Sequence, residues 1–206
     1  MLLKTEKYDF KSVLFLFEAI GVIALHVSKK NGEEKDKLEN HLFNYFNVAI
    51  KRNSDLLNFC FQILAIFLHF ENKTVDKHKM IYDSLLNIDN WVEDNISVMS
   101  SYIQYISAYL NRSPNSLVSD KTKFEEILSR LFQLEHYDLF FRFLESILKI
   151  TSFEQFYETG YFKLSIMGSE AVAGKNIFSK KTGILFIFKL MNNYNLNKVV
   201  QCVIFL

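Results

Sequence analysis

The segment LLNFCFQIL at residues 56–64 decides the fold, because bulky apolar segments of the same character return along the chain. They are VLFLFEAI at 13–20, SYIQYISAYL at 101–110, LFFRFLESIL at 139–148 and a weaker copy, TGILFIFKL, at 182–190. The spacing of about 40 residues is the period of helix-pair solenoids of the HEAT and armadillo kind. The recurrence therefore predicts an all-α fold, and it indicates a scaffold before an enzyme.

More polar stretches with helical character separate these segments, and each is predicted to form the second helix of a pair. They lie at residues 35–51, 75–88, 122–134 and 153–165. A single helix pair cannot cover its own apolar face, so it must stack on neighbouring pairs to build a continuous core. A helix flanked on both sides is apolar nearly all round, as the recurring segments are.

The predicted organisation is one HEAT-like helix-pair solenoid of about five repeats covering residues 1–206. The repeats are expected at approximately 8–52, 53–90, 91–134, 135–168 and 175–206. Residues 199–206 are apolar to the last position, whereas the end of a solenoid needs a polar cap. We expect the chain to be part of a longer solenoid; the alternative is a last helix that docks back on its neighbour.

Composition narrows the class of protein. Half of the 206 residues are hydrophobic, which is enough to build a sizeable core. The formal net charge of +1 gives no electrostatic indication that the chain binds nucleic acid. The apolar run at 15–27 is too short to span a bilayer and contains Glu18, so no membrane insertion is expected. Cys60 and Cys202 lie in apolar sequence, which is typical of reduced core thiols in an intracellular protein.

One stretch resembles a phosphate-binding loop: GSEAVAGKN at residues 168–176, after a potentially strand-like segment at 161–166. A phosphate loop has four residues between its glycines and a Ser or Thr after the lysine. Here five residues separate Gly168 from Gly174, and Asn176 follows Lys175. An inter-repeat loop is the favoured interpretation, and no nucleotide or other cofactor is expected.

No catalytic or metal-binding constellation is readable elsewhere. The five histidines contain no pair spaced four residues apart, as a helical metal face requires: His26, His41, His69, His78 and His136. Tyr102, Tyr105 and Tyr109 share one helical stripe, where their hydroxyls could contact a partner, but packing between repeats is the favoured interpretation. Trp91 is interpreted as a packing anchor.

Three segments carry a resemblance to a known family. They are residues 17–20 (FEAI), 61–68 (FQILAIFL) and 82–96, in which a Leu-Leu turn leads to Trp91 and then to an Asn-Ile helix start. In this order they resemble the importin-α re-exporters, the exportin-2 (cellular apoptosis susceptibility) type of β-karyopherin. The resemblance covers roughly residues 8–150.

The resemblance implies a HEAT-repeat superhelix that binds Ran in its GTP form together with importin-α in the nucleus. Both partners are released in the cytoplasm after GTP hydrolysis, so a family member shuttles and can contact the nuclear pore. The resembling stretch belongs to the C-terminal portion of much longer proteins, without the N-terminal repeats that make the main Ran contacts. No Ran- or cargo-binding residue transfers to this chain, and a helical scaffold unrelated to transport is the alternative function.

Overall fold

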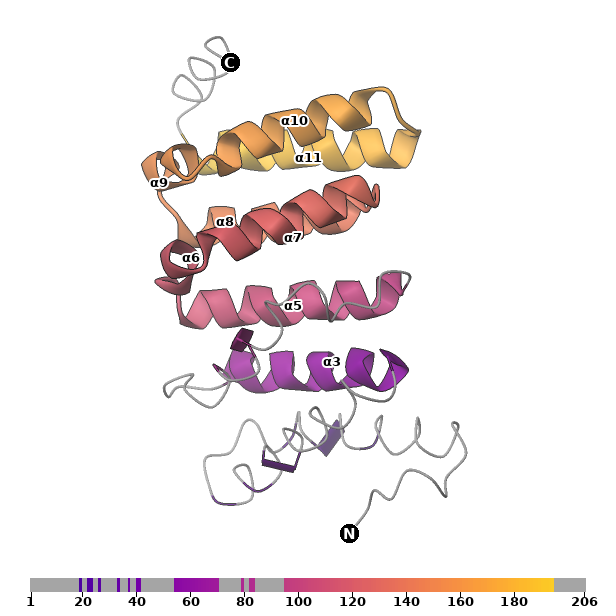
Figure 1. The fold of residues 1–206 in the computed structure, drawn as a ribbon, viewed down its shortest axis with the longest axis vertical. Helices are drawn as coiled ribbons and strands as arrows, with labels where there is room; N and C mark the ends of the chain where they lie inside the picture. Colours follow the sequence, from indigo (N-terminus) through magenta and orange to yellow (C-terminus); the bar gives the residue numbers. More distant parts are fainter. Residues whose placement is uncertain are drawn as a thin grey trace. The chain divides into compact units, whose positions relative to one another are not determined.

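A computed structural model of the chain describes residues 54–70 and 95–194, together with isolated positions at 19, 22, 23, 26, 33, 37, 40, 41, 79, 82 and 83. The described residues form helices and no strand (Figure 1). The helices are α3 (Ser54–Phe70), α5 (Ile96–Arg112), α6 (Ser116–Ser119), α7 (Lys121–Gln133), α8 (Tyr137–Ile150), α9 (Phe153–Glu158), α10 (Tyr161–Ala173) and α11 (Ile177–Asn193). The predicted all-α, helical-repeat class is confirmed.

The chain divides into two compact units. The first comprises Met1–Ile81 and Val92–Ala108, and the second comprises Tyr82–Trp91 and Tyr109–Leu206. Helix α5 contributes its N-terminal part to the first unit and its last turn to the second. The repeat boundaries stay a prediction.

In the first unit, α3 contacts α5 through both apolar and polar side chains. The ring of Phe61 packs against Tyr102 in a T-shaped pair with centroids 5.5 Å apart. Beside this pair, the amide of Gln62 donates to Ser101 Oγ at 3.2 Å, and Ser101 Oγ donates to Asn58 Oδ1. The hydrogen bonds matter because Ser101 is only 4% exposed, and a buried hydroxyl without a partner would destabilise the fold.

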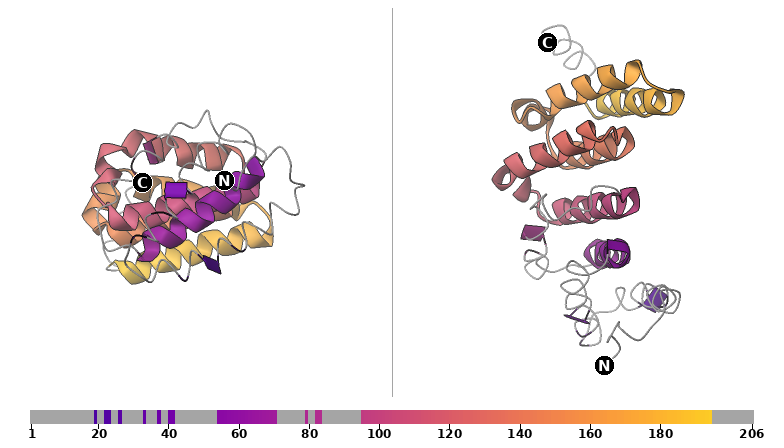
Figure 2. Two further views of the ribbon diagram at one scale, coloured as in Figure 1. Left: turned by 90° about the horizontal axis from the view of Figure 1, so that it is seen from below. Right: turned by 45° about the vertical axis from the view of Figure 1, so that its right-hand side comes forward.

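The second unit is organised around α8, which packs against α7, α9, α10 and α11. Figure 2 shows α7 beside α8 and α10 beside α11, each pair joined by a short turn. The buried residues of α8 face several neighbours at once: Tyr137, Leu139, Phe140, Phe141, Phe143, Leu144, Ile147 and Leu148. Phe143 meets Phe124 of α7 at 5.7 Å between centroids, and Phe141 meets Phe186 of α11 at 5.3 Å.

The predicted helices agree with the structure in most of the described range. The apolar segments at 56–64, 101–110, 139–148 and 182–190 lie within α3, α5, α8 and α11, and the polar segment at 122–134 is α7 shifted by one residue. The segments at 13–20, 35–51 and 75–88 lie outside the described residues apart from isolated positions. Pro114 falls in the break between α5 and α6, because a proline is not tolerated in the interior of a helix.

The predicted single helix at 153–165 is wrong. The structure has two helices there, α9 and α10, because Gly160 adopts a left-handed conformation with φ +87° between them. A residue without a Cβ atom enters this conformation at little cost, and the chain changes direction there. Ser152 begins α9 with a capping box: its hydroxyl accepts from the Gln155 N–H, and the Gln155 side chain accepts from the Ser152 N–H.

The turn between α7 and α8 is a Schellman motif without its usual glycine. The His136 N–H donates to Leu131 O at 2.9 Å, and the Glu135 N–H donates to Phe132 O at 3.1 Å. Glu135 occupies the left-handed position with φ +57°. His136 is the N-cap of α8, and Asp138 lies in the first turn of that helix.

Candidate functional site

The stretch that resembles a phosphate-binding loop is mostly helix. The strand-like segment at 161–166 and residues 168–173 all belong to α10, so the predicted loop is confined to Gly174, Lys175 and Asn176. Asn176 Oδ1 accepts from the Ser179 N–H at 3.0 Å, which caps the start of α11. These residues make a helix–turn–helix connection and no phosphate cradle.

Gly168 and Lys175 have structural roles. A Cβ atom at Gly168 would lie 2.5 Å from Phe140 Cε1, so the glycine is what lets α10 approach α8 closely. The Lys175 ammonium donates to Glu135 Oε1 at 2.7 Å, and this hydrogen bond raises the pKa of Lys175. The exposed ion pair joins the α10–α11 turn to the α7–α8 turn.

The tyrosine stripe on α5 is buried. Tyr102, Tyr105 and Tyr109 are each at most 2% exposed, so packing explains them and the partner-binding interpretation is not supported. In the second unit, Tyr109 stacks on Tyr82 with ring centroids 4.0 Å apart, and the Tyr82 hydroxyl donates to Asp120 Oδ2 at 3.1 Å. The Tyr82–Asp120 pair joins residues 38 positions apart and is not predictable from the sequence, because nothing local to either residue indicates the other.

The remaining candidate residues, the cysteines, the histidines and Trp91, do not form a common site in the described part of the chain. Cys60 is 1% exposed, and its burial raises the pKa of the thiol to about 12, so it is an unreactive core residue as predicted. Across the described residues, no three His, Cys, Asp or Glu side chains gather closely enough to hold a metal ion. Trp91, His78 and Cys202 lie outside the described residues.

None of the described helices is long and apolar enough to cross a bilayer.

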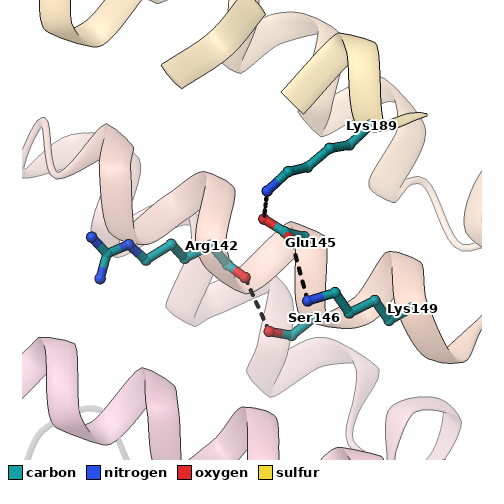
Figure 3. A network of polar contacts seen from close by, with 5 residues as sticks. All are labelled: Arg142, Glu145, Ser146, Lys149 and Lys189. Atoms are coloured by element: carbon teal, nitrogen blue, oxygen red, sulfur yellow. Dashed lines mark hydrogen bonds and ion pairs between the residues drawn. The ribbon is translucent and has the colours of Figure 1, made fainter. Parts of the chain in front are cut away.

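A network of polar contacts centred on Glu145 links α8 to α11 (Figure 3). Its carboxylate accepts from Lys189 of α11 at 2.5 Å and lies 3.1 Å from the Lys149 ammonium on its own helix. Partial burial opposes ionisation, but the hydrogen bonds from Lys189 and Lys149 outweigh it and lower the pKa of Glu145. Next to it, the Arg142 guanidinium pairs with Asp138 at 2.8 Å.

This arrangement gives α8 an apolar side in the core and an exposed side of alternating charge. Ion pairs on an exposed helix face contribute little to stability, about 0–1 kcal/mol each. They can therefore exchange partners at small cost.

Described residues that form only helices, with aromatic side chains buried between them, define the class as a helical-repeat protein. Within that class, a family model described as "CAS/CSE protein, C-terminus" matches residues 9–163, which is most of the chain. The chain belongs to the CAS/CSE family, whose members are nuclear transport receptors. The match begins within one residue of the predicted resemblance and extends beyond its end, into α10. No curated protein and no solved structure matches the chain.

Proposed function

We propose that this chain acts in the export of importin-α from the nucleus, binding importin-α and Ran-GTP together. The observation that carries the proposal is the match of residues 9–163 to the C-terminus of CAS/CSE proteins. The all-helical packing supports it, because helix-pair repeats present long surfaces to protein partners.

The proposed activity is a binding cycle without a chemical step in the receptor. If Ran-GTP and importin-α favour the same conformation of the receptor, each raises the affinity for the other by the same factor. GTP hydrolysis on Ran then removes that coupling, and the cargo is released. We accordingly propose that the chain itself is not an enzyme, that it shuttles between nucleus and cytoplasm, and that it passes the nuclear pore through protein contacts.

The proposal includes the location of binding. Exposed, mutually paired charges such as Arg142 with Asp138 lie on the outer side of α8, where a partner's charges could replace them. Buried residues such as Tyr102 and Tyr105 are not available to a partner. We therefore assign binding to exposed helix faces and not to the aromatic stripe.

A capture experiment with purified components tests the function. The chain is immobilised and incubated with importin-α alone, with importin-α and Ran-GTP, and with importin-α and Ran-GDP. Retention of importin-α only with Ran-GTP is the expected result. Equal retention in all three samples would instead indicate a helical scaffold unrelated to transport, and no retention in any of them would contradict both functions.

A matched variant keeps the result interpretable. Arg142→Glu reverses an exposed charge on α8, whereas Tyr105→Ala removes a buried ring that is 0% exposed. Binding through exposed faces predicts that Tyr105→Ala weakens capture only as far as it unfolds the protein, which circular dichroism measures. A folded Tyr105→Ala protein that fails to capture would refute the assignment of binding to the exposed faces.

A further inference from the structure

The turn between α5 and α6 contains the single proline of the chain, Pro114. Ser113 precedes it, so this is the one position in the 206 residues where a serine or threonine is followed by proline. The neighbouring residues Arg112, Pro114 and Asn115 are exposed, and Ser113 itself is half-buried. The Ser-Pro pair therefore lies in a surface turn.

A Ser-Pro pair in such a turn has the properties of a kinase substrate. A protein kinase binds its substrate as an extended segment, and proline disfavours the helical conformation for the residue before it. Proline also has no N–H group, so it enters an apolar pocket without leaving a donor unpaired. We propose that Ser113 is a phosphorylation site for a proline-directed protein kinase and that the phosphate opens the turn between α5 and α6.

The reaction is a phosphoryl transfer from ATP. The Ser113 Oγ attacks the γ-phosphorus, its O–H bond breaks, and the proton passes to a base of the kinase. The bond between the γ-phosphorus and the bridging oxygen breaks at the same time, and ADP leaves with its electron pair.

The surroundings of Ser113 explain why a phosphate would open the turn. Ser113 Oγ lies 3.1 Å from Ser116 Oγ, and the Ser116 N–H donates to Ser113 O at 3.0 Å. Burial raises the pKa of the nearby Tyr109, and hydrogen bonds from Ser116 and Ser113 oppose this rise. The Asp83 and Asp120 carboxylates raise that pKa further, so two negative charges lie close to the same group of hydroxyls.

A phosphate would add a charge of about −1.5 to −2 to this group, and like-charge repulsion beside carboxylates disrupts local structure. Asp120 is the central carboxylate, because its Oδ2 accepts from Ser119 Oγ at 3.2 Å and from the Tyr82 hydroxyl at 3.1 Å. Tyr82 in turn stacks on Tyr109 at 4.0 Å between centroids. Repulsion of Asp120 therefore weakens the contacts that hold the turn against the end of α5.

Phosphorylation in vitro tests the site. The full chain is incubated with ATP and a cyclin-dependent or a mitogen-activated protein kinase, and peptide mass spectrometry measures the phosphorylated fraction at each serine. Ser113→Ala removes the acceptor, whereas Pro114→Ala keeps the hydroxyl and removes the proline. Ser119 is an internal control, because it is exposed and is followed by Asp120.

We expect phosphate on Ser113, loss of this phosphate in both variants, and none on Ser119. Circular dichroism checks that the variants are folded. Absence of phosphate on Ser113 with both kinases, under conditions that modify a Ser-Pro peptide, would overturn the proposal. Undiminished phosphorylation of Ser113 in a folded Pro114→Ala protein would overturn it as well.

Hydrogen exchange tests the effect of the phosphate. Amides of residues 113–120 are expected to exchange about tenfold faster in the phosphorylated protein, and those of α10 at an unchanged rate. High salt should reduce the difference, because it screens exposed charges. Equal exchange of residues 113–120 in the two forms would refute the opening of the turn. Neither experiment involves Ran or importin-α, so the proposal stands or falls independently of the transport function.

Discussion

Substitution of Gly168 by alanine should destabilise the protein although alanine is the better helix former. A Cβ atom at this position would lie 2.5 Å from Phe140 Cε1, 3.2 Å from Phe140 Cζ and 3.3 Å from Phe141 Cζ. Carbon atoms prefer separations of about 3.5–4.0 Å. The Phe140 ring would have to move by roughly 1 Å, or α10 would have to move away from α8.

Neither movement is easy in this core. Phe140 is 1% exposed, and its ring contacts Phe132 at 5.9 Å and Phe141 at 5.2 Å between centroids. Overpacking of a core by one methyl group costs about 1–3 kcal/mol. Replacing a glycine inside a helix by alanine increases the free energy of unfolding by about 0.5–1 kcal/mol, because alanine loses less backbone freedom on folding. The net loss of unfolding free energy is therefore about 0–2.5 kcal/mol, and at about 2–4 °C per kcal/mol for a chain of this size the melting temperature falls by up to about 10 °C.

Gly174, at the end of the same helix, is the matched control. Its φ of −87° suits any residue, and no described atom lies within 4 Å of a Cβ built there. Gly174→Ala should stabilise by about 0.4–1 kcal/mol, chiefly by restricting the unfolded chain. Thermal and urea unfolding, followed by circular dichroism, measure both variants. A rise in melting temperature for Gly168→Ala as large as that for Gly174→Ala would refute the close approach of α10 to α8.

Three further predictions concern single side chains. Tyr161→Phe should raise the urea midpoint and increase the free energy of unfolding by about 1–3 kcal/mol, because the buried hydroxyl has no hydrogen-bond partner in the described part of the chain. A lower urea midpoint would show that the hydroxyl has a partner. Glu135→Gly should raise the melting temperature, since relief of a left-handed conformation is worth about 1 kcal/mol and the lost ion pair with Lys175 is exposed; a fall would show that this pair dominates. Glu145→Gln should destabilise the protein near pH 7 but have a diminishing effect in acid. Folding lowers the pKa of Glu145, so the carboxylate stabilises the folded protein above its unfolded pKa near 4.5, and this stabilisation disappears as the pH falls through the folded pKa. Urea unfolding from pH 7 to pH 3 should therefore show the stabilities of the two proteins converging. A difference in stability that stays constant over this range would contradict the prediction.

The helices of this fold were largely predictable because their apolar residues follow a helical period. Asn95 illustrates a local signal: it precedes Ile96, and its side chain accepts from the Ser97 and Val98 N–H groups at 3.2 Å, which confirms the predicted helix start. The family resemblance was predictable because the segments that carry it, at residues 17–20, 61–68 and 82–96, follow one another in the order typical of the family and lie within the matched residues 9–163.

Tertiary context decided the features that the sequence did not predict. Gly168 and Gly160 look alike in the sequence, yet one lies inside α10 against Phe140 and the other breaks the chain between α9 and α10. The link between Glu145 and Lys189 joins residues 44 positions apart, so neither residue's neighbours indicate it. The tyrosine stripe left two interpretations open, and only burial separated them.

The most direct test of the proposed transport function is the affinity for importin-α, measured by titration calorimetry with and without saturating Ran-GTP. Coupled binding predicts that Ran-GTP tightens the dissociation constant for importin-α by about 5–150-fold, that importin-α tightens Ran-GTP binding by the same factor, and that Ran-GDP has no effect. An importin-α affinity that is the same in the presence and absence of Ran-GTP would contradict the proposed role in nuclear export.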